Sequence, residues 1–337
     1  MQIKSRFLRT VPLAVFCSIF LLTAYGWYGL SQPLWHSVEA APGPHSGATS
    51  VAALQRHVDV LSTDYANRSF EKMSRLNGAA QYIETQWTEM GLAVQSQRFV
   101  AEENNFRNLI VRLGPDTRDV VVIGAHYDVA GTQPGADDNA SGVAGLIELT
   151  RLLKDAPLKT RVELVAYTNE EPPFFRTPSM GSAVHAKALK ASGKQASLML
   201  SLECIGYFSD APGSQTHPVR LLNAVYPTVG NFIALVGFYK DGEVSRRVKT
   251  AMLGATDLPV HSINAPSFVV GIDFSDHLNY AHEGFVGMMV TDTAFYRNKA
   301  YHTPQDTADR LDYVRMGKVV DGVHRAVLVQ AGVAAAQ

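Results

Sequence analysis

The sequence predicts an α/β fold, in which a mainly parallel, mixed central sheet lies between two layers of helices. Residues 119–128, 161–171 and 196–207 are apolar, β-branched runs typical of strands that are buried on both faces. Helix-periodic segments, 141–155 and 182–193, follow the first two runs. This alternation predicts parallel strands joined by helical crossovers, and therefore a three-layer α/β/α architecture.

Further elements flank this repeating unit. Apolar residues at helical spacing predict helices at 51–62 and 76–90. Strand-like runs follow at 92–100 and 106–114, and a final apolar strand is expected at 285–294. The stretch 208–275 contains several glycines and prolines and shows no clear period. We expect this stretch to shape specificity, and its fold is not predicted.

The N-terminus indicates export. Residues 11–30 carry no charge and are numerous enough to cross a bilayer as a helix. Lys4, Arg6 and Arg9 precede them, which places the N-terminus on the inner side. The alternative is a cleaved signal peptide, for which residues 38–40 (VEA) offer a small-residue cleavage site. Either way we expect a periplasmic or extracellular protein, anchored in the membrane if the segment is kept and secreted if it is cut.

The chain therefore divides into an anchor or signal segment (1–30), a linker rich in Pro, Gly, Ser and Ala (31–50) and a single catalytic domain (51–337). The formal net charge of −1 excludes a global basic field for nucleic acid. Cys17 lies in the apolar segment and Cys204 in an expected core strand, so we expect no disulfide between them. The oligomeric state is left open.

Acidic and histidine side chains stand at the carboxyl ends of the expected strands. They are His126 and Asp128, Glu170 and Glu171, Glu203, and His302 beyond the last strand, with Asp137 and Asp138 in a loop before a helix. Because ligand sites in open parallel sheets form outside these strand ends, we expect the side chains to converge.

Imidazole and carboxylate groups together suit zinc or a similar divalent metal. Their number exceeds what one tetrahedral zinc needs and fits two metals roughly 3.5–4 Å apart that share a bridging carboxylate. The neighbours Glu170 and Glu171 suggest that one binds metal while the other acts as general base. Since neighbours in a strand face opposite ways, this pair is expected in a loop beyond the strand end.

Five pieces of the chain, in order, resemble the M28 family of zinc peptidases, which includes aminopeptidases, glutamate carboxypeptidases and the related glutaminyl cyclases. They are GAHYD, GADDNASG, NEE, SLECIGY and YHTPQDT, and the resemblance covers roughly residues 70 to 330. It implies a zinc-exopeptidase fold, a peptide substrate and two Zn²⁺ per chain.

The resemblance also implies roles. His126, Asp138 and Glu203 would bind one metal, and Asp138, Glu171 and His302 the other. Many aminopeptidases of the family carry aspartate where Glu203 stands.

Glu170 would be the catalytic base. Asp128 would orient the histidine two residues earlier, and Asp137 would be a flanking acid. A matching tyrosine in some relatives suggests that Tyr301 helps to hold the oxyanion.

The first expected function is removal of N-terminal residues from peptides, because a free amine suits a site rich in carboxylates. A carboxypeptidase would need cations such as Arg176 or Arg297, and a glutaminyl cyclase would use one zinc. A non-catalytic, receptor-like domain is the last alternative, although no ligand or base is missing from the motifs.

Overall fold

The computed structural model describes residues 26–34, 38 and 48–333. Its sheet has the strand order β1-β2-β4-β3-β5-β8-β6-β7. The strands are β1 (Val94–Ala101), β2 (Asn104–Leu113), β3 (Asp119–His126), β4 (Arg161–Tyr167), β5 (Gln195–Leu202), β6 (Ile233–Phe238), β7 (Val260–Ala265) and β8 (Gly287–Thr291). Because β3, β4, β5 and β8 pair in parallel, their carboxyl ends lie at one edge of the sheet.

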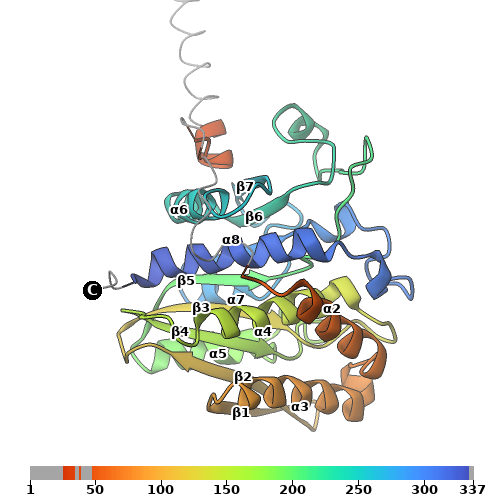
Figure 1. The fold of residues 1–337 in the computed structure, drawn as a ribbon, viewed down its shortest axis with the longest axis vertical. Helices are drawn as coiled ribbons and strands as arrows, with labels where there is room; N and C mark the ends of the chain where they lie inside the picture. Colours follow the sequence, from red (N-terminus) through yellow and green to blue (C-terminus); the bar gives the residue numbers. More distant parts are fainter. Residues whose placement is uncertain (1–25, 35–37, 39–47, 334–337) are drawn as a thin grey trace, which may run out of the picture.

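Helices cover both faces of the sheet (Figure 1). One layer contains α2 (Val51–Asp59), α3 (Met73–Glu89), α4 (Gly142–Leu153), α6 (Gly242–Leu253) and α8 (Tyr313–Ala331). The other contains α5 (Gly181–Ala191) and the short α7 (His277–His282), which pack against each other. The three-layer α/β/α architecture and the mainly parallel sheet are therefore confirmed.

Strand β3 shows why the apolar runs form the centre of the sheet. Val121 and Ile123 belong to the core under α4 and α8, whereas Val120 and Val122 belong to the core under α5. All four are fully buried. Each such side chain contributes about 1.5–3 kcal/mol by leaving water, so two apolar faces favour a strand over an exposed loop.

The stretch 208–275 adds β6, α6 and β7, and β6 pairs antiparallel with β8. The two strands have six residues each, a length at which an apolar run does not distinguish a strand from other buried structure. This part of the sheet forms the edge opposite β1.

Most of the N-terminal apolar segment, residues 11–30, lies outside the described residues, and so do two of the three residues of the possible cleavage site at 38–40. The described part begins with a short helix at residues 26–31. Among the residues that the structure describes, no helix combines the length and the apolar character needed to cross a membrane.

Candidate metal centre

The carboxyl ends of the parallel strands carry the candidate ligands. His126 is the last residue of β3, and Glu203 directly follows β5. Strand β4 ends at Tyr167, so Glu170 and Glu171 lie in the loop beyond it, as expected. All four side chains are buried.

Asp138 lies between two groups of ligand atoms. Its Oδ1 is 3.3 Å from Nε2 of His126, which is also 3.3 Å from Oε2 of Glu203. Its Oδ2 is 2.9 Å from Nε2 of His302, which is 3.2 Å from Oε1 of Glu171. One carboxylate therefore faces a histidine and a glutamate on each side, which is the arrangement of a bridging ligand.

The donor set fits metal ions. Asp138 Oδ2 and Glu171 Oε1 are buried and both face the single nitrogen Nε2 of His302, and neither makes a well-formed hydrogen bond within the described part of the chain. Leaving such atoms without a partner is costly unless something else satisfies them. Ligand atoms of His126, Asp138 and Glu171 lie within 4.8 Å of one another, as do those of Asp138, Glu203 and Cys204. This buried group of histidine and acidic residues could hold a metal ion.

The backbone around Asp138 is held by Asp306. The two carboxylate oxygens of Asp306 accept hydrogen bonds from the N–H groups of Asp137 and Asp138, both at 3.0 Å. Gly135 enters the loop with a φ of 61°, and a Cβ there would lie 2.4 Å from the carbonyl oxygen of Asp138. Only glycine fits this turn, which directs Asp138 toward the two histidines.

Asp128 connects two ligand segments. Its Oδ1 accepts from the backbone N–H of Glu170 at 3.2 Å, and its Oδ2 accepts from that of Glu171 at 3.1 Å. Its Oδ1 also lies 3.5 Å from Nδ1 of His126. A single carboxylate thus fixes the loop after β4 relative to the histidine at the end of β3.

Glu203 is fixed by its neighbours. Ser275 donates to its Oε2 at 2.8 Å, and the thiol of Cys204 donates to its Oε1 at 3.4 Å. Burial, together with the carboxylates of Asp138 and Glu203, raises the pKa of Cys204 well above its usual range. The thiol therefore stays protonated, in keeping with a structural rather than a nucleophilic cysteine.

Asp137 points away from the ligand atoms. Its oxygens accept from the N–H of Gly206 at 3.0 Å and from the side-chain amide of Asn298 at 2.9 Å. Burial and the nearby Asp292 raise the pKa of Asp137 well above its usual range, and burial raises that of Asp292 to about 6. The two acids form a buried pair behind the centre that ties its loop to the loops after β5 and β8.

The pKa values of the candidate ligands are shifted because these side chains are buried close to one another. Burial disfavours charge on His302, but Asp138 and Glu171 outweigh it and raise its pKa to about 10. The carboxylates of Glu203, Asp128 and Asp138 likewise raise the pKa of His126, against the effect of burial. Burial and Asp138 raise the pKa of Glu171 to about 7. Protons thus occupy the positions that a cation would take, so metal binding should release them.

Glu170 is the carboxylic acid beside the ligand groups. Burial raises its pKa well above the usual range, His126 opposes this, and the carboxylates of Glu171 and Glu203 add to it. A glutamate whose proton affinity is raised in this way is suited to accept and return a proton near neutral pH. Tyr301 stacks flat on the ring of His302, with ring centroids 3.9 Å apart.

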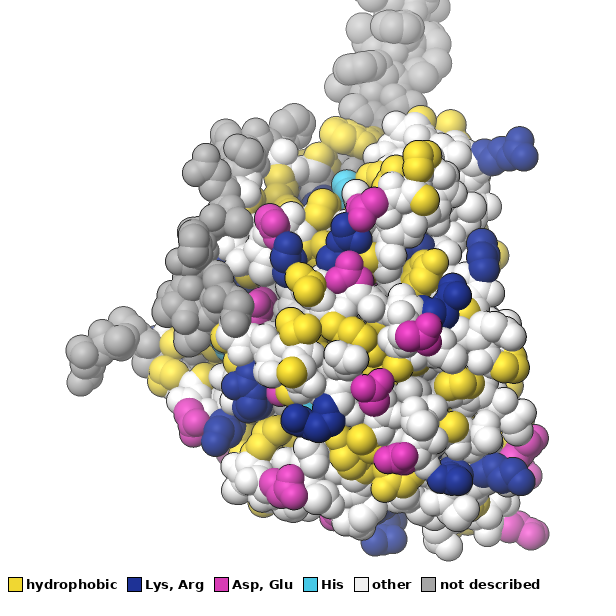
Figure 2. All heavy atoms as spheres, turned by 45° about the vertical axis from the view of Figure 1, so that its right-hand side comes forward, with side chains coloured by type: hydrophobic (Ala, Val, Ile, Leu, Met, Phe, Trp, Pro, Cys, Tyr) yellow, Lys and Arg dark blue, Asp and Glu magenta, His cyan; other side chains and the backbone are white. Residues whose placement is uncertain are grey.

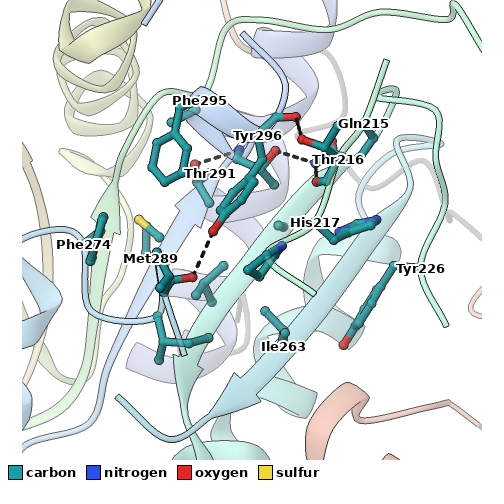
Figure 3. Close-up of a pocket in the computed structure, with 18 of the residues that line it drawn as sticks. Gln215, Thr216, His217, Tyr226, Ile263, Phe274, Met289, Thr291, Phe295 and Tyr296 are labelled. Carbon is teal, nitrogen blue, oxygen red and sulfur yellow. Dashed lines mark hydrogen bonds between the residues drawn. The ribbon is translucent and has the colours of Figure 1, made fainter. Parts of the chain in front are cut away.

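An apolar pocket borders the centre. It encloses about 850 Å³, including the open space at its mouth, and Glu203 and Tyr301 form part of its wall. Figure 3 shows the aromatic rings of Phe274, Phe295 and Tyr296 on one side of this space. Histidines, threonines and one glutamine are the main polar groups in the wall.

Sequence reasoning missed Arg68, which is fully buried. Its guanidinium donates to the carbonyl oxygens of Tyr127 and Gly135, at 2.8 and 2.7 Å, and to those of Leu61 and Pro134. Arg68 thus holds the loop between His126 and Asp138 in shape. An arginine some sixty residues before the ligand motifs carries no local signal of this role.

Two further acids belong to the surroundings of the centre. Asp306, in YHTPQDT, orients the Asp138 backbone. Asp276, which directly precedes α7, is buried, and burial raises its pKa to about 7 although His126 opposes the effect. Glu203 lies near enough to add to this effect, so Asp276 belongs to the same cluster of charges.

A cluster of histidines and carboxylates at the strand ends of an α/β sheet is typical of metal-dependent hydrolases. The model of peptidase family M28 matches residues 108–327, so the chain belongs to this family. This confirms the resemblance found in the five motifs.

Two relatives and two solved structures extend the comparison. The chain is 47% identical to the uncharacterized protein YfbL of Escherichia coli, over 90% of this chain and 94% of the relative. It is 25% identical to a probable leucine aminopeptidase of Arthroderma otae, over 75% of this chain and 65% of that protein.

The aminopeptidase LapA of Legionella pneumophila superposes with a TM-score of 0.68 at 19% identity, covering 86% of this chain and 74% of LapA. A glutaminyl cyclase of Bacteroides thetaiotaomicron superposes with a TM-score of 0.62 at 16% identity, covering 83% of this chain and 97% of the cyclase. At these identities the likeness establishes the fold and not the reaction.

Proposed function

We propose that this protein is a two-zinc aminopeptidase that removes apolar residues from the N-termini of peptides. The observation that carries the proposal is the position of Asp138, one carboxylate between two pairs of histidine and glutamate. His126, Asp138 and Glu203 would hold one zinc, and Asp138, Glu171 and His302 the second. Bound zinc supplies a Lewis acid and lowers the pKa of water.

Side chains of the protein would carry out the proton transfers and stabilise the oxyanion. Glu170 would accept a proton from the attacking water and return it to the leaving amine. Tyr301 lies beside His302 at the wall of the pocket, where its hydroxyl would donate to the developing oxyanion. Asp128 would keep the loop of Glu170 in register with His126 throughout the cycle.

Charge favours an aminopeptidase over a carboxypeptidase. The carboxylates around the centre suit a protonated α-amine. Of the two arginines considered for a substrate carboxylate, Arg176 already pairs with Asp273 at 2.6 Å. Arg297 is 3% exposed and donates to Gln215 and to the carbonyl oxygen of Tyr207. Arg176 is therefore already paired with an acid, and Arg297 is closed off from solvent.

The pocket supports the preference for apolar residues. It extends to Glu203, and its wall is mainly aromatic and aliphatic, with Phe274, Met289 and Phe295 among its side chains. Burying an apolar side chain there would contribute about 1.5–3 kcal/mol, whereas a charged one would lose hydration without a partner.

The test uses the zinc-loaded full chain and a panel of aminoacyl p-nitroanilides. We expect leucine and phenylalanine substrates to be cleaved faster than aspartate and lysine ones, and N-acetyl-leucine anilide to resist. Glu170→Gln should abolish turnover while both zinc ions stay bound. Cleavage only of blocked peptides with free C-termini, ring closure of N-terminal glutamine, or full activity of Glu170→Gln would each contradict the proposal.

A further inference from the structure

Two loops form the outer wall of the apolar pocket. The loop 216–228 contributes Pro218, Leu222 and Tyr226, and the loop 266–271 contributes Val269 and Val270. The first loop contains the 3-10 turn Arg220–Ala224 and follows β5, and the second follows β7. Figure 1 shows the loop that follows β5 extending from the β6–β7 edge of the molecule.

Both loops carry exposed apolar side chains at or next to residues that line the pocket. Phe268 is 83% exposed, Leu221 77% and Val270 54%. The two loops contain no acidic residue, and Arg220 is their one Lys or Arg. Figure 2 shows apolar side chains near the top of one face of the molecule. Exposed apolar residues gathered around a pocket mouth mark an interaction surface, and their lack of negative charge suits a lipid headgroup layer.

The start of the described chain, at residues 28–31, packs against β7 and α6, next to this wall. Ser262 and Lys249 both donate to the carbonyl oxygen of Ser31, at 2.9 and 3.1 Å. Leu30 and Val269 both pack against one apolar cluster, which contains Phe232 and Ile272. A Cβ at Gly29 would lie 2.6 Å from the hydroxyl of Tyr239, so the chain approaches the residue that follows β6 closely at this point.

This attachment fixes where the apolar segment 11–30 joins the domain. Its last residues contact α6 and β7, and Ser262 of β7 also lines the pocket. Arg246 of α6 lies 4.2 Å from the ring centroid of Tyr28. The segment 11–30 therefore joins the domain at β7, and β7 lies between this junction and the pocket. A membrane that holds the part of this segment before Tyr28 would lie next to the exposed loops.

We propose that Leu221, Phe268 and Val270 insert into the interfacial layer of a lipid bilayer, so that the apolar pocket opens at the membrane surface. The bilayer is the occupant because the chain's own apolar segment meets the domain beside these loops. Peptides that lie at the bilayer with an apolar N-terminus would then reach the pocket without crossing bulk water. The membrane contact does not depend on hydrolysis, so it can be tested without a substrate.

The experiment measures the depth of single labels. The full chain with Cys17→Ser keeps Cys204 as its one cysteine, and this residue is fully buried. In that background, Phe268→Cys and Leu221→Cys place a thiol on each exposed loop. Val100→Cys is the matched control, because Val100 is an apolar residue with 68% exposure on β1, at the opposite edge of the sheet.

Each variant is synthesised without cells in the presence of nanodiscs made of phosphatidylethanolamine and phosphatidylglycerol, and is labelled with a nitrobenzoxadiazole probe. We expect the emission at positions 268 and 221 to shift to the blue and to be quenched by nitroxide lipids. The probe at position 100 should emit as in water. The proposal is overturned if the label at either loop behaves like the label at position 100, as it would if the loops faced solvent or bound another protein.

Discussion

Replacing Asp128 with asparagine removes one acceptor from the group that joins two ligand segments. The carboxylate accepts from the N–H groups of Glu170 and Glu171, at 3.2 and 3.1 Å, and lies 3.5 Å from His126. The amide keeps one acceptor oxygen but turns an NH₂ group toward the other backbone N–H. Hydrogen bonds to charged groups contribute about 1.5–3 kcal/mol, so one such loss corresponds to roughly a 10- to 100-fold effect.

We expect kcat/KM of Asp128→Asn for leucine p-nitroanilide to fall by about 10- to 100-fold at saturating zinc. Zinc affinity, measured by competition with a chromogenic chelator, should fall in the same range. The melting temperature should fall by only a few degrees, because one hydrogen bond is lost while the volume of the side chain is kept.

Asp116→Asn is the control. The Asp116 side chain is 67% exposed and pairs at the surface with Arg161 at 3.2 Å and with Lys194, and exposed pairs of this kind contribute little to stability. Its activity should equal that of the unmodified protein. If Asp128→Asn kept full activity and full zinc affinity, the carboxylate would not be what aligns the two segments, and this part of the reasoning would be refuted.

Three further results are expected. Arg68→Met should lower the free energy of unfolding by about 3–5 kcal/mol in urea titrations, since it leaves several buried carbonyl groups unpaired; a change below about 1 kcal/mol would contradict this. Burial, with a smaller effect of Arg56, lowers the pKa of His57 to about 4. An unfolded histidine titrates near 6.5, so stability should fall by up to about 3 kcal/mol as the pH drops from 6.5 to 4, and His57→Gln should remove that part of the slope. An unchanged slope would assign the acid sensitivity to other groups. Tyr301→Phe should lower kcat with both zinc ions retained, and unchanged turnover would remove this hydroxyl from the mechanism.

Local sequence patterns predict much of the fold. The run 119–128 has β-branched residues on both faces, and both faces are buried in the structure. The polar residues at the ends of such runs were recognisable because charge directly after a buried strand is costly without a partner. His126, Glu171 and Glu203 could therefore be predicted to converge before any coordinates were known.

The other features of the fold and the site depend on contacts between residues that lie far apart in the sequence. Strands β6 and β7 are defined by pairing with β8 and with each other, and not by their own short sequences. Arg68 acts through backbone carbonyl groups, which look alike in every sequence. The pocket combines residues from the whole range between Glu203 and Tyr301, so its apolar character appears only when the chain is folded.

The central claim is that Asp138 joins two zinc sites in one centre. Its most direct test is the metal content of the full chain, measured by mass spectrometry after equilibration with buffered zinc and removal of loosely bound ions. The account predicts two zinc ions per unmodified chain and loss of both sites at the same zinc activity in Asp138→Ala. One zinc ion or none in the unmodified chain, or two in Asp138→Ala, would contradict it.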